Sequence, residues 1–327
     1  MFRDRSLSLA STLAFAALAL TASLAQAAEY PEKPIRLIVP QAAGSNTDIV
    51  ARALAAELSP VLGQPLVIDN RPGAGLIIGL EITSKSAPDG YTLCMSPIGA
   101  LAISPNMFEK LPYVVERDFQ PIAQLTNGPL MLAVSTSLPV NSAREIVEYA
   151  KKNPGKLSFA SSTAGSPGHL AGELLKQITG GLIEHIPYKG GAPAIADLLA
   201  GRVQIMFEGM NSMAPHVKAG KLKGIALTSD KRISAFPDMP TMAESGLPGF
   251  DISVWQGMVA PTGIARPLLD RINGAVNRAV ATPAFATRML ELGNVPAGGT
   301  PEEFAALIKR DSSRWGEVIR KAGIKAN

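Results

Sequence analysis

Residues 34–54 read PIRLIVPQAAGSNTDIVARAL, and residues 157–175 read LSFASSTAGSPGHLAGELL. Each stretch places an apolar strand before a short loop rich in Gly, Ser, Thr or Asn, and that loop before a helix. The first N–H groups of a helix have no partner within the helix and lie at the positive end of its dipole, so each loop predicts a site for a carboxylate or phosphate. Two such sites far apart in the chain predict a cleft between two lobes.

The first 27 residues predict a secretory signal peptide. Arg3 and Arg5 form a basic start, an apolar stretch runs from about residue 7 to residue 24, and residues 25–27 form a small-residue cleavage site. A retained membrane anchor is the alternative. Ser and Thr interrupt the apolar stretch, and no later apolar run approaches the ~20 residues that a spanning helix needs. We therefore expect a mature protein that is soluble outside the cytoplasm.

The chain of 327 residues carries a formal net charge of +4, which becomes +3 when Arg3, Asp4 and Arg5 leave with the predicted signal peptide. A charge this small and dispersed argues against a nucleic-acid partner. The single cysteine, Cys94, cannot form an internal disulfide, so the fold must rest on its apolar core. A 46% hydrophobic content makes that feasible, and a chain of this size is expected to divide into two lobes. We expect a monomer.

Residues 34–96 alternate short apolar strands with helices. The pattern predicts strands at residues 34–39, 65–69 and 91–96 and helices at residues 47–58 and 76–86. Such alternation is typical of right-handed βαβ units on a mostly parallel sheet. The first lobe is therefore expected to be of the α/β class.

An extended segment at residues 119–126 predicts the exit from this lobe, and a second α/β series follows. Its strands are expected at residues 130–134, 157–160, 183–187, 203–207 and 224–228, and its helices near 142–151, 167–178, 192–200 and 211–219. After Pro240 the chain is expected to be helix-rich, to end in a helix over 301–322 and to return to the first lobe. Two crossings, near 119–126 and 228–237, then divide the chain into lobe 1 (28–122 and 233–327) and lobe 2 (123–232).

Catalytic and metal-binding motifs are weak. The three histidines, His169, His185 and His216, stand at spacings that match no zinc motif, so neither a metal nor another cofactor is predicted. Ser166 precedes a proline and lacks the G-x-S-x-G pattern of a nucleophile elbow. A secreted hydrolase that uses Ser166 and His169 stays open as an alternative, although we do not expect an enzyme. His169 either binds the ligand or lies in the first helical turn as a solvent-facing or capping residue.

Two acidic residues are candidates for the cleft. Asp48 stands in the first turn of the first helix, where a carboxylate caps free N–H groups; direct contact with a cationic ligand group is the alternative. Glu208 follows the strand at residues 203–207 at its carboxyl end, the edge where ligands bind in open α/β sheets. It lies either in the cleft or on its rim. The glycine-rich run at residues 73–79 has the wrong spacing for a dinucleotide site and predicts a turn with close helix packing.

Eight short motifs, in order over some 290 residues, carry a resemblance to a known family. They are Pro40…Gly44…Thr47-Asp48-Ile49-Val50-Ala51-Arg52, Asn70-Arg71-Pro72-Gly73-Ala74-Gly75, Ala87-Pro88-Asp89-Gly90-Tyr91-Thr92-Leu93, Ala160-Ser161-Ser162, His169-Leu170-Ala171-Gly172-Glu173-Leu174, Pro187-Tyr188-Lys189-Gly190-Gly191-Ala192-Pro193, Phe236-Pro237-Asp238-Met239-Pro240-Thr241 and Ala322-Gly323-Ile324. With these motifs, the mature chain resembles the periplasmic solute receptors of tripartite tricarboxylate transporters, the Bug or TctC-type family.

The resemblance implies a two-lobed periplasmic-binding-protein fold of type II, a Venus flytrap that closes on a small carboxylate-bearing solute and delivers it to a membrane permease. By the same resemblance the ligand meets one loop from each lobe and a third loop at the cleft. Together with His169 and Glu208, the candidate ligand-binding residues are Ala43, Gly44, Ser45, Asn46, Thr47, Asp48, Ile98, Gly99, Ser162, Thr163, Gly165 and Ser166.

The chain departs from the family pattern inside these loops. Relatives usually carry glycines where Ser45 and Asn46 stand, an aromatic residue in place of Gln41, Gly in place of Thr163 and Asp in place of Glu208. These changes add hydrogen-bonding side chains to the pocket, so they bear on which solute is bound. A receptor that reports its solute to a signalling partner, in place of a permease, is a further alternative.

Overall fold

The computed structural model describes residues 30–163, 165–188, 190–250 and 252–324. The predicted signal peptide at residues 1–27 lies outside this part of the chain. Within the described part, no helix combines the length and the hydropathy needed to cross a membrane.

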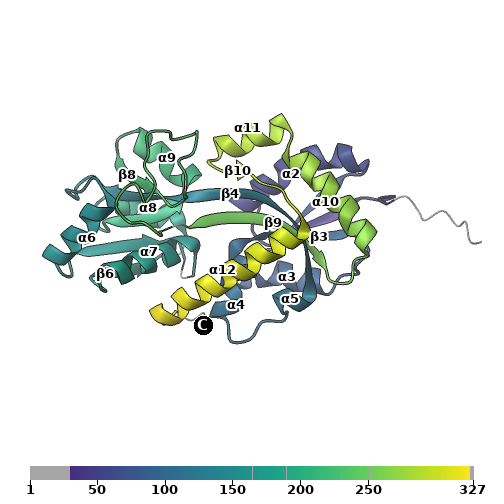
Figure 1. Ribbon diagram of the computed structural model, residues 1–327, viewed down its shortest axis with the longest axis horizontal. Helices are drawn as coiled ribbons and strands as arrows, with labels where there is room; N and C mark the ends of the chain where they lie inside the picture. Colours follow the sequence, from purple (N-terminus) through teal and green to yellow (C-terminus); the bar gives the residue numbers. More distant parts are fainter. Residues whose placement is uncertain (1–29, 164, 189, 251, 325–327) are drawn as a thin grey trace, which may run out of the picture.

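Strands and helices alternate along most of the chain (Figure 1). The strands are β1 (Ile35–Val39), β2 (Leu66–Asn70), β3 (Thr92–Pro97), β4 (Phe119–Ser135), β5 (Leu157–Ser161), β6 (Ile183–Pro187), β7 (Ile205–Gly209), β8 (Leu222–Leu227), β9 (Ser253–Pro261) and β10 (Val295–Pro296). The helices and helical turns are α2 (Asn46–Leu62), η1 (Ala74–Leu76), α3 (Ile77–Ser84), η2 (Gly99–Ile103), α4 (Ser104–Met107), α5 (Val115–Asp118), α6 (Ala143–Lys152), α7 (Pro167–Ile178), α8 (Gly191–Leu199), α9 (Met210–Lys218), α10 (Arg266–Val280), α11 (Pro283–Glu291) and α12 (Pro301–Ala322).

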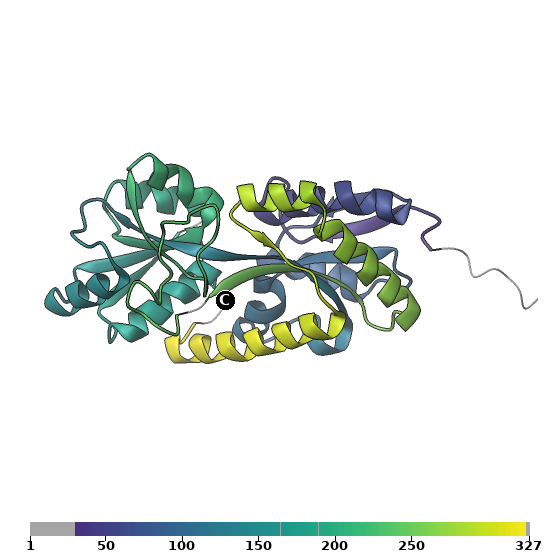
Figure 2. The same cartoon turned by 45° about the horizontal axis from the view of Figure 1, so that its top comes forward.

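The strands form a curled sheet that serves two lobes. Its order is β2-β1-β3-β9-β4-β7-β5-β6, with β8 and β10 also paired to β4. The first half of β4 pairs with β9, and its second half, from Leu130 on, pairs with β7 and β8. Figure 2 shows the result: two bodies joined by long strands, with the yellow helix α12 running beneath both. The predicted α/β fold with two lobes and two crossing segments is confirmed.

The crossing strands differ from the prediction. Residues 119–135 form one continuous strand, not an exit segment followed by a new strand. Pro121 and Pro129 lie within this strand, although proline cannot donate to a strand ladder. Irregularities in the pairing beside Pro121 and after Gln124 let β4 continue past them. A second correction concerns residues after Pro240, which form β9 and β10 as well as the expected helices.

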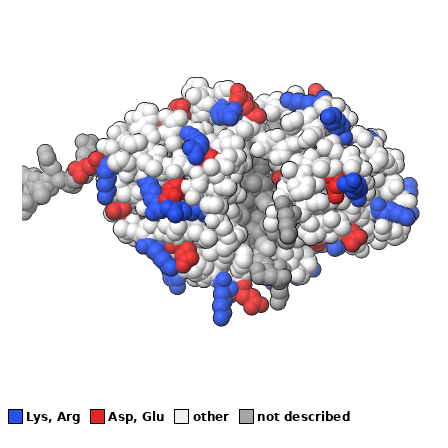
Figure 3. Space-filling view, turned by 180° about the vertical axis from the view of Figure 1, so that it is seen from behind, with Lys and Arg blue, Asp and Glu red and all other residues white. Residues whose placement is uncertain are grey.

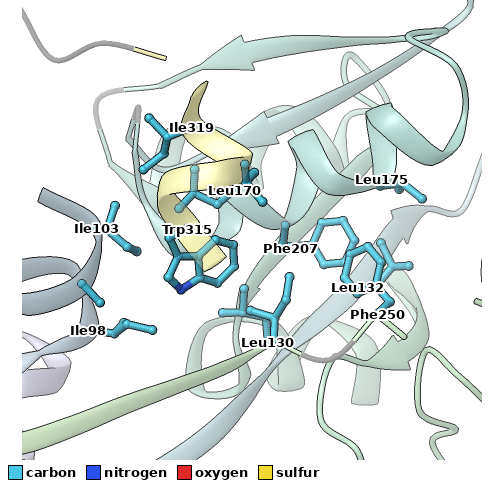
Figure 4. Packing of buried hydrophobic residues seen from close by; sticks show 14 of the residues in the cluster. Ile98, Ile103, Leu130, Leu132, Leu170, Leu175, Phe207, Phe250, Trp315 and Ile319 are labelled. Carbon is cyan, nitrogen blue, oxygen red and sulfur yellow. The ribbon is translucent and has the colours of Figure 1, made fainter. Parts of the chain in front are cut away.

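One apolar core extends through both lobes. Figure 4 shows Trp315 of α12 between Ile98 and Ile103 of the first lobe and Leu170 of α7 in the second lobe. The Trp315 side chain is fully buried. Two further clusters lie within single lobes, one between β1 and α2 and α10, the other between β7 and α8 and α9. Helix α12 therefore packs on both lobes beside the crossing strands.

The lobe boundaries at 122/123 and 232/233 stay a prediction. We propose that the crossings lie where the strands change partners, after Pro129 in β4 and before Ser253 in β9. The segment before β9 is still held by the second lobe, because the Ile252 N–H donates to the Thr228 carbonyl at 2.7 Å and the Thr228 hydroxyl donates to the Ile252 carbonyl at 2.6 Å.

Substitution of Gly257 by Ala tests the packing of α12 on the crossing strands. A Cβ at Gly257 in β9 would overlap the Phe304 ring of α12, so the ring or the helix must shift. We expect Gly257→Ala to lower the free energy of unfolding by about 1–3 kcal/mol in urea titrations. Gly274→Ala is the matched control, because its Cβ meets only the end of the Arg278 side chain, at 3.7 Å, and Ala favours a helix interior. Equal stability of the two variants would contradict this packing.

Candidate ligand-binding site

A cavity of about 440 Å³ lies between the two lobes. Figure 3 shows the surface from behind, with a furrow between two halves that each carry mixed positive and negative side chains. Residues of the first lobe, the crossing strands and the second lobe line the cavity. They are Gln41, Gly44, Asn46, Thr47, Leu76, Pro97, Ile98 and Gly99; Gly128, Pro129, Leu130, Val254 and Gln256; Ser162, Ser166, Pro167, Gly168, Glu208, Gly209, Met210, Asn211 and Ser212; and Leu292, Gly293 and Asn294.

The first wall is the loop between β1 and α2. Ser45 caps α2, and its hydroxyl accepts the Asp48 N–H at 3.2 Å. Gly44 has a φ of 80°, a left-handed conformation that glycine adopts without steric cost. Asn46 and Thr47 are the first two residues of α2, and both line the cavity. Because the first turn of a helix has free N–H groups, this wall can hold an anion.

Hydrogen bonds to the buried Asp48 carboxylate fix the conformation of this loop. The residue is 2% exposed, and its carboxylate accepts bonds from the Gly44 N–H (2.8 Å), the Arg52 guanidinium (2.9 Å) and the Asn70 amide (3.0 Å). Burial alone would raise the pKa of the Asp48 carboxyl, but the bonds from Arg52, Gly44 and Asn70 outweigh it and hold the pKa below its ordinary value. Asp48 is therefore the internal cap that the sequence favoured, and it does not line the cavity.

The second wall is the loop between β5 and α7. Ser166 caps α7 by accepting the His169 N–H at 3.2 Å, and Pro167 occupies the first helical position. The Gly165 N–H donates to His169 Nδ1 at 2.8 Å, so the histidine ring fixes the loop from inside the lobe. The ring does not bond the Ser166 hydroxyl; it lacks the contact by which a histidine would activate a serine nucleophile.

The three residues His169, Glu173 and His185 cluster behind this wall, with one ligand atom of each within 4.8 Å of the others. The two imidazole rings stack at 3.8 Å between centroids, and His185 Nε2 is 2.7 Å from the Ser161 hydroxyl. Burial, with the neighbouring His169, lowers the pKa of His185 to about 4. Stacked rings direct their nitrogen lone pairs side by side and not toward one point, so this geometry suits packing better than metal coordination.

A third wall comes from the end of β7 and the crossing strands. Glu208 and Gly209 precede α9, and the Gly209 N–H donates to Glu208 Oε1 at 3.0 Å. Burial raises the pKa of the Glu208 carboxyl, and bonds from Gly209 and Ser162 offset part of that rise. Gln256 of β9 is 3% exposed, and among the described residues its Oε1 has no hydrogen-bond partner. Asn46 Oδ1 in the first wall is also buried, and it too has no hydrogen-bond partner among the described residues.

Comparison with known proteins gives the family. Residues 50–324 match the model of the tripartite tricarboxylate transporter family receptor. The chain belongs to this receptor family. It is 38% identical over 312 residues to Protein BugT of Bordetella pertussis, covering 95% of this chain and 96% of that protein, and 36% identical over 319 residues to a UPF0065 protein of Pseudomonas sp. strain P51, covering 96% and 95%.

Solved structures of related receptors share the two-lobed fold. The structure of R. palustris Rpa4515 with adipate has 34% identity and a TM-score of 0.80 over 90% of this chain and 99% of that one. That of MatC from Rhodopseudomonas palustris with bound malate has 32% identity and a TM-score of 0.75 over 89% and 100%. The homologues are receptors and not enzymes, so the hydrolase alternative built on Ser166 and His169 is wrong for this receptor.

The structure brings part of the predicted site together. The candidate residues that line the cavity are Gly44, Asn46, Thr47, Ile98, Gly99, Ser162, Ser166 and Glu208. Those that do not are Ala43, Ser45, Asp48, Thr163, Gly165 and His169. Sequence reasoning did not select Gln256 or Asn294, because the first lies in a strand that was not predicted and the second follows α11 from the far end of the chain. Which of these residues bind solute stays a prediction.

Asp48→Asn tests how the first loop is held. The pKa of Asp48 lies below its ordinary value of 3.8, so its carboxylate stabilises the fold at neutral pH and this contribution disappears as the pH falls below 3.8. We expect the variant to lose about 1.5–3 kcal/mol of unfolding free energy at pH 7, since charged hydrogen bonds contribute that much. Urea titrations at several pH values measure this, with the exposed Asp238→Asn as control. A gap from wild type that is as wide at pH 3 as at pH 7 would argue against this role.

Proposed function

We propose that this receptor binds a small carboxylate-bearing solute in the interlobe cavity, in the periplasm, and delivers it as a monomer to a tripartite tricarboxylate-type membrane permease. Secretion through the N-terminal signal peptide is part of the proposal. The related structures described with adipate and with malate support the class of solute, because both ligands are carboxylates.

The observation that carries the proposal is the convergence of helix starts on one cavity. The first turns of α2 and α9 and the cap and first turn of α7 all line it, and they come from both lobes. Main-chain N–H groups and hydroxyls there can replace the water around a carboxylate, each charge-assisted bond contributing roughly 1.5–3 kcal/mol. Because the groups come from both lobes, a bound anion favours the closed arrangement over the open one.

A panel of mono-, di- and tricarboxylates tests binding directly. At a concentration 100 times its Kd, a solute that binds the folded receptor stabilises it by about 2.7 kcal/mol, which raises the melting temperature measurably. If none of these acids raises the melting temperature, the proposed function fails. Uptake of the solute by cells that lack the receptor gene, with and without a plasmid copy, tests delivery.

Gly44→Ala and Gly63→Ala form a matched pair of variants for the site. Both glycines have a left-handed φ, 80° and 76°, and a Cβ at either meets no atom within 4 Å. Both variants should therefore lose about 1–2 kcal/mol of stability. Only Gly44 lines the cavity, so its new methyl group takes the room of the solute and we expect at least about tenfold weaker binding by calorimetry. Equal affinities of the two variants would place the solute elsewhere.

A further inference from the structure

The turn at residues 73–76, between β2 and α3, has a left-handed backbone. Among the described residues other than glycine, Ala74 and Leu76 alone have a left-handed φ, of 45° and 81°. Gly75 between them has a φ of 63°, and the Leu76 N–H donates to the Gly73 carbonyl at 3.1 Å. A Cβ crowds the backbone in this conformation, so leucine is strained where glycine would not be.

Leucine is also a poor residue for the start of the helix that follows. Leu76 is the N-cap of α3, and its side chain forms no capping hydrogen bond. Ser, Thr, Asp and Asn stabilise this position because their side chains accept a main-chain N–H, which leucine cannot do. Leu76 is therefore unfavourable both for the backbone of the turn and for the start of α3. Locally unfavourable residues concentrate at functional sites, so Leu76 calls for a functional reason.

Leu76 lies on the wall of the interlobe cavity. The residue is half-buried, and it packs against the core cluster that contains Ile98. A Cβ at Gly99, which lines the same cavity, would lie 3.2 Å from Leu76 Cδ1. Ala74, two residues earlier, is exposed and is not among the residues that line the cavity. Of the two strained residues, only Leu76 can therefore meet a solute.

We propose that Leu76 is a specificity-determining residue whose side chain limits the length of the solute at the first-lobe wall of the cavity. The inference rests on the proposed function and concerns the size of the solute, not its chemical class. Glycine would suit this backbone and leave the volume open, whereas leucine fills it. An acid that fits the remaining space packs against the side chain, and a longer one meets it as an obstacle.

A purely structural role of Leu76 leads to a different expectation. If the side chain only supported Gly99 and the core beside it, its removal would lower stability and weaken the binding of every acid to a similar degree. If it limits the length of the solute, its removal changes the order in which acids of different length bind. The ranking of acids by affinity therefore separates the two roles.

Leu76→Gly tests the proposal, because it removes the side chain and relieves the backbone. Calorimetric titrations at pH 7.5 with straight-chain mono- and dicarboxylates of increasing length measure the affinity of the wild type and the variant for each acid. Each methylene group that leaves water on binding raises affinity about fourfold. We therefore expect acids longer than the best wild-type ligand to gain about tenfold or more in the variant, relative to that ligand.

Ala74→Gly is the matched control. It relieves the other left-handed residue of the same turn but leaves the cavity wall as it is. The variant should be at least as stable as wild type in urea titrations and should rank the acids as wild type does. Leu76→Ala shortens the side chain and keeps the Cβ, so it should change the ranking in the same direction as Leu76→Gly and be less stable than that variant.

The outcomes separate this proposal from the broader one. If acids bind but Leu76→Gly ranks them as wild type does, or weakens all of them equally, the length limit is wrong and the carboxylate receptor stands. If no acid binds the wild type, the proposed function itself fails. A changed ranking in Ala74→Gly would assign the effect to the backbone of the turn and overturn the proposal. Thermal unfolding without ligand shows whether Leu76→Gly is folded; if it is not, Leu76→Ala decides, and an unchanged ranking there would contradict the proposal.

Discussion

The structure depends on helix starts whose main-chain N–H groups are left without partners inside the helix. Such groups need hydrogen-bond acceptors. Three of these helix starts, at α2, α7 and α9, line the cavity, so their N–H groups can bond to a molecule held there. Two of these starts are shaped by side chains of the protein itself. Ser45 and Asp48 shape the first loop, while Ser166 and His169 shape the second. Loops held in this way need little further ordering when a ligand binds.

The crossing strands turn these separate starts into one site. β4 passes from the sheet of the first lobe into that of the second, and β9 pairs with it along the first part of this path. Helix α12 packs on both lobes through Trp315, and the indole N–H of Trp255 in β9 donates to the Asp311 carboxylate of α12 at 2.7 Å. These contacts hold the crossing strands against α12. The two loops thus line a single cavity.

Local signals predicted much of this arrangement. The helices at residues 167–178 and 301–322 and the strand at residues 183–187 have the predicted bounds, because caps, prolines and apolar runs specify them within a few residues. The two loops followed from the same local pattern. What the sequence left open was decided by distant contacts: His169 is buried on His185, and Glu208 lies in the cleft and not on its rim. Gln256 could not be found locally, since only the pairing of β9 with β3 and β4 brings it to the cavity.

Main-chain groups and side chains have separate roles in the cavity, which explains how one fold can bind different solutes. A main-chain N–H is supplied by nearly every residue type, so a loop can change its side chains and still bind a carboxylate. Side chains such as Asn46, Glu208 and Gln256 line the same cavity, so a change at these positions can alter which solute binds. Relatives with 32–34% identity to this chain share its fold, and their structures are described with two different acids. Among the described lining residues, the carboxyl group of Glu208 is one such side chain.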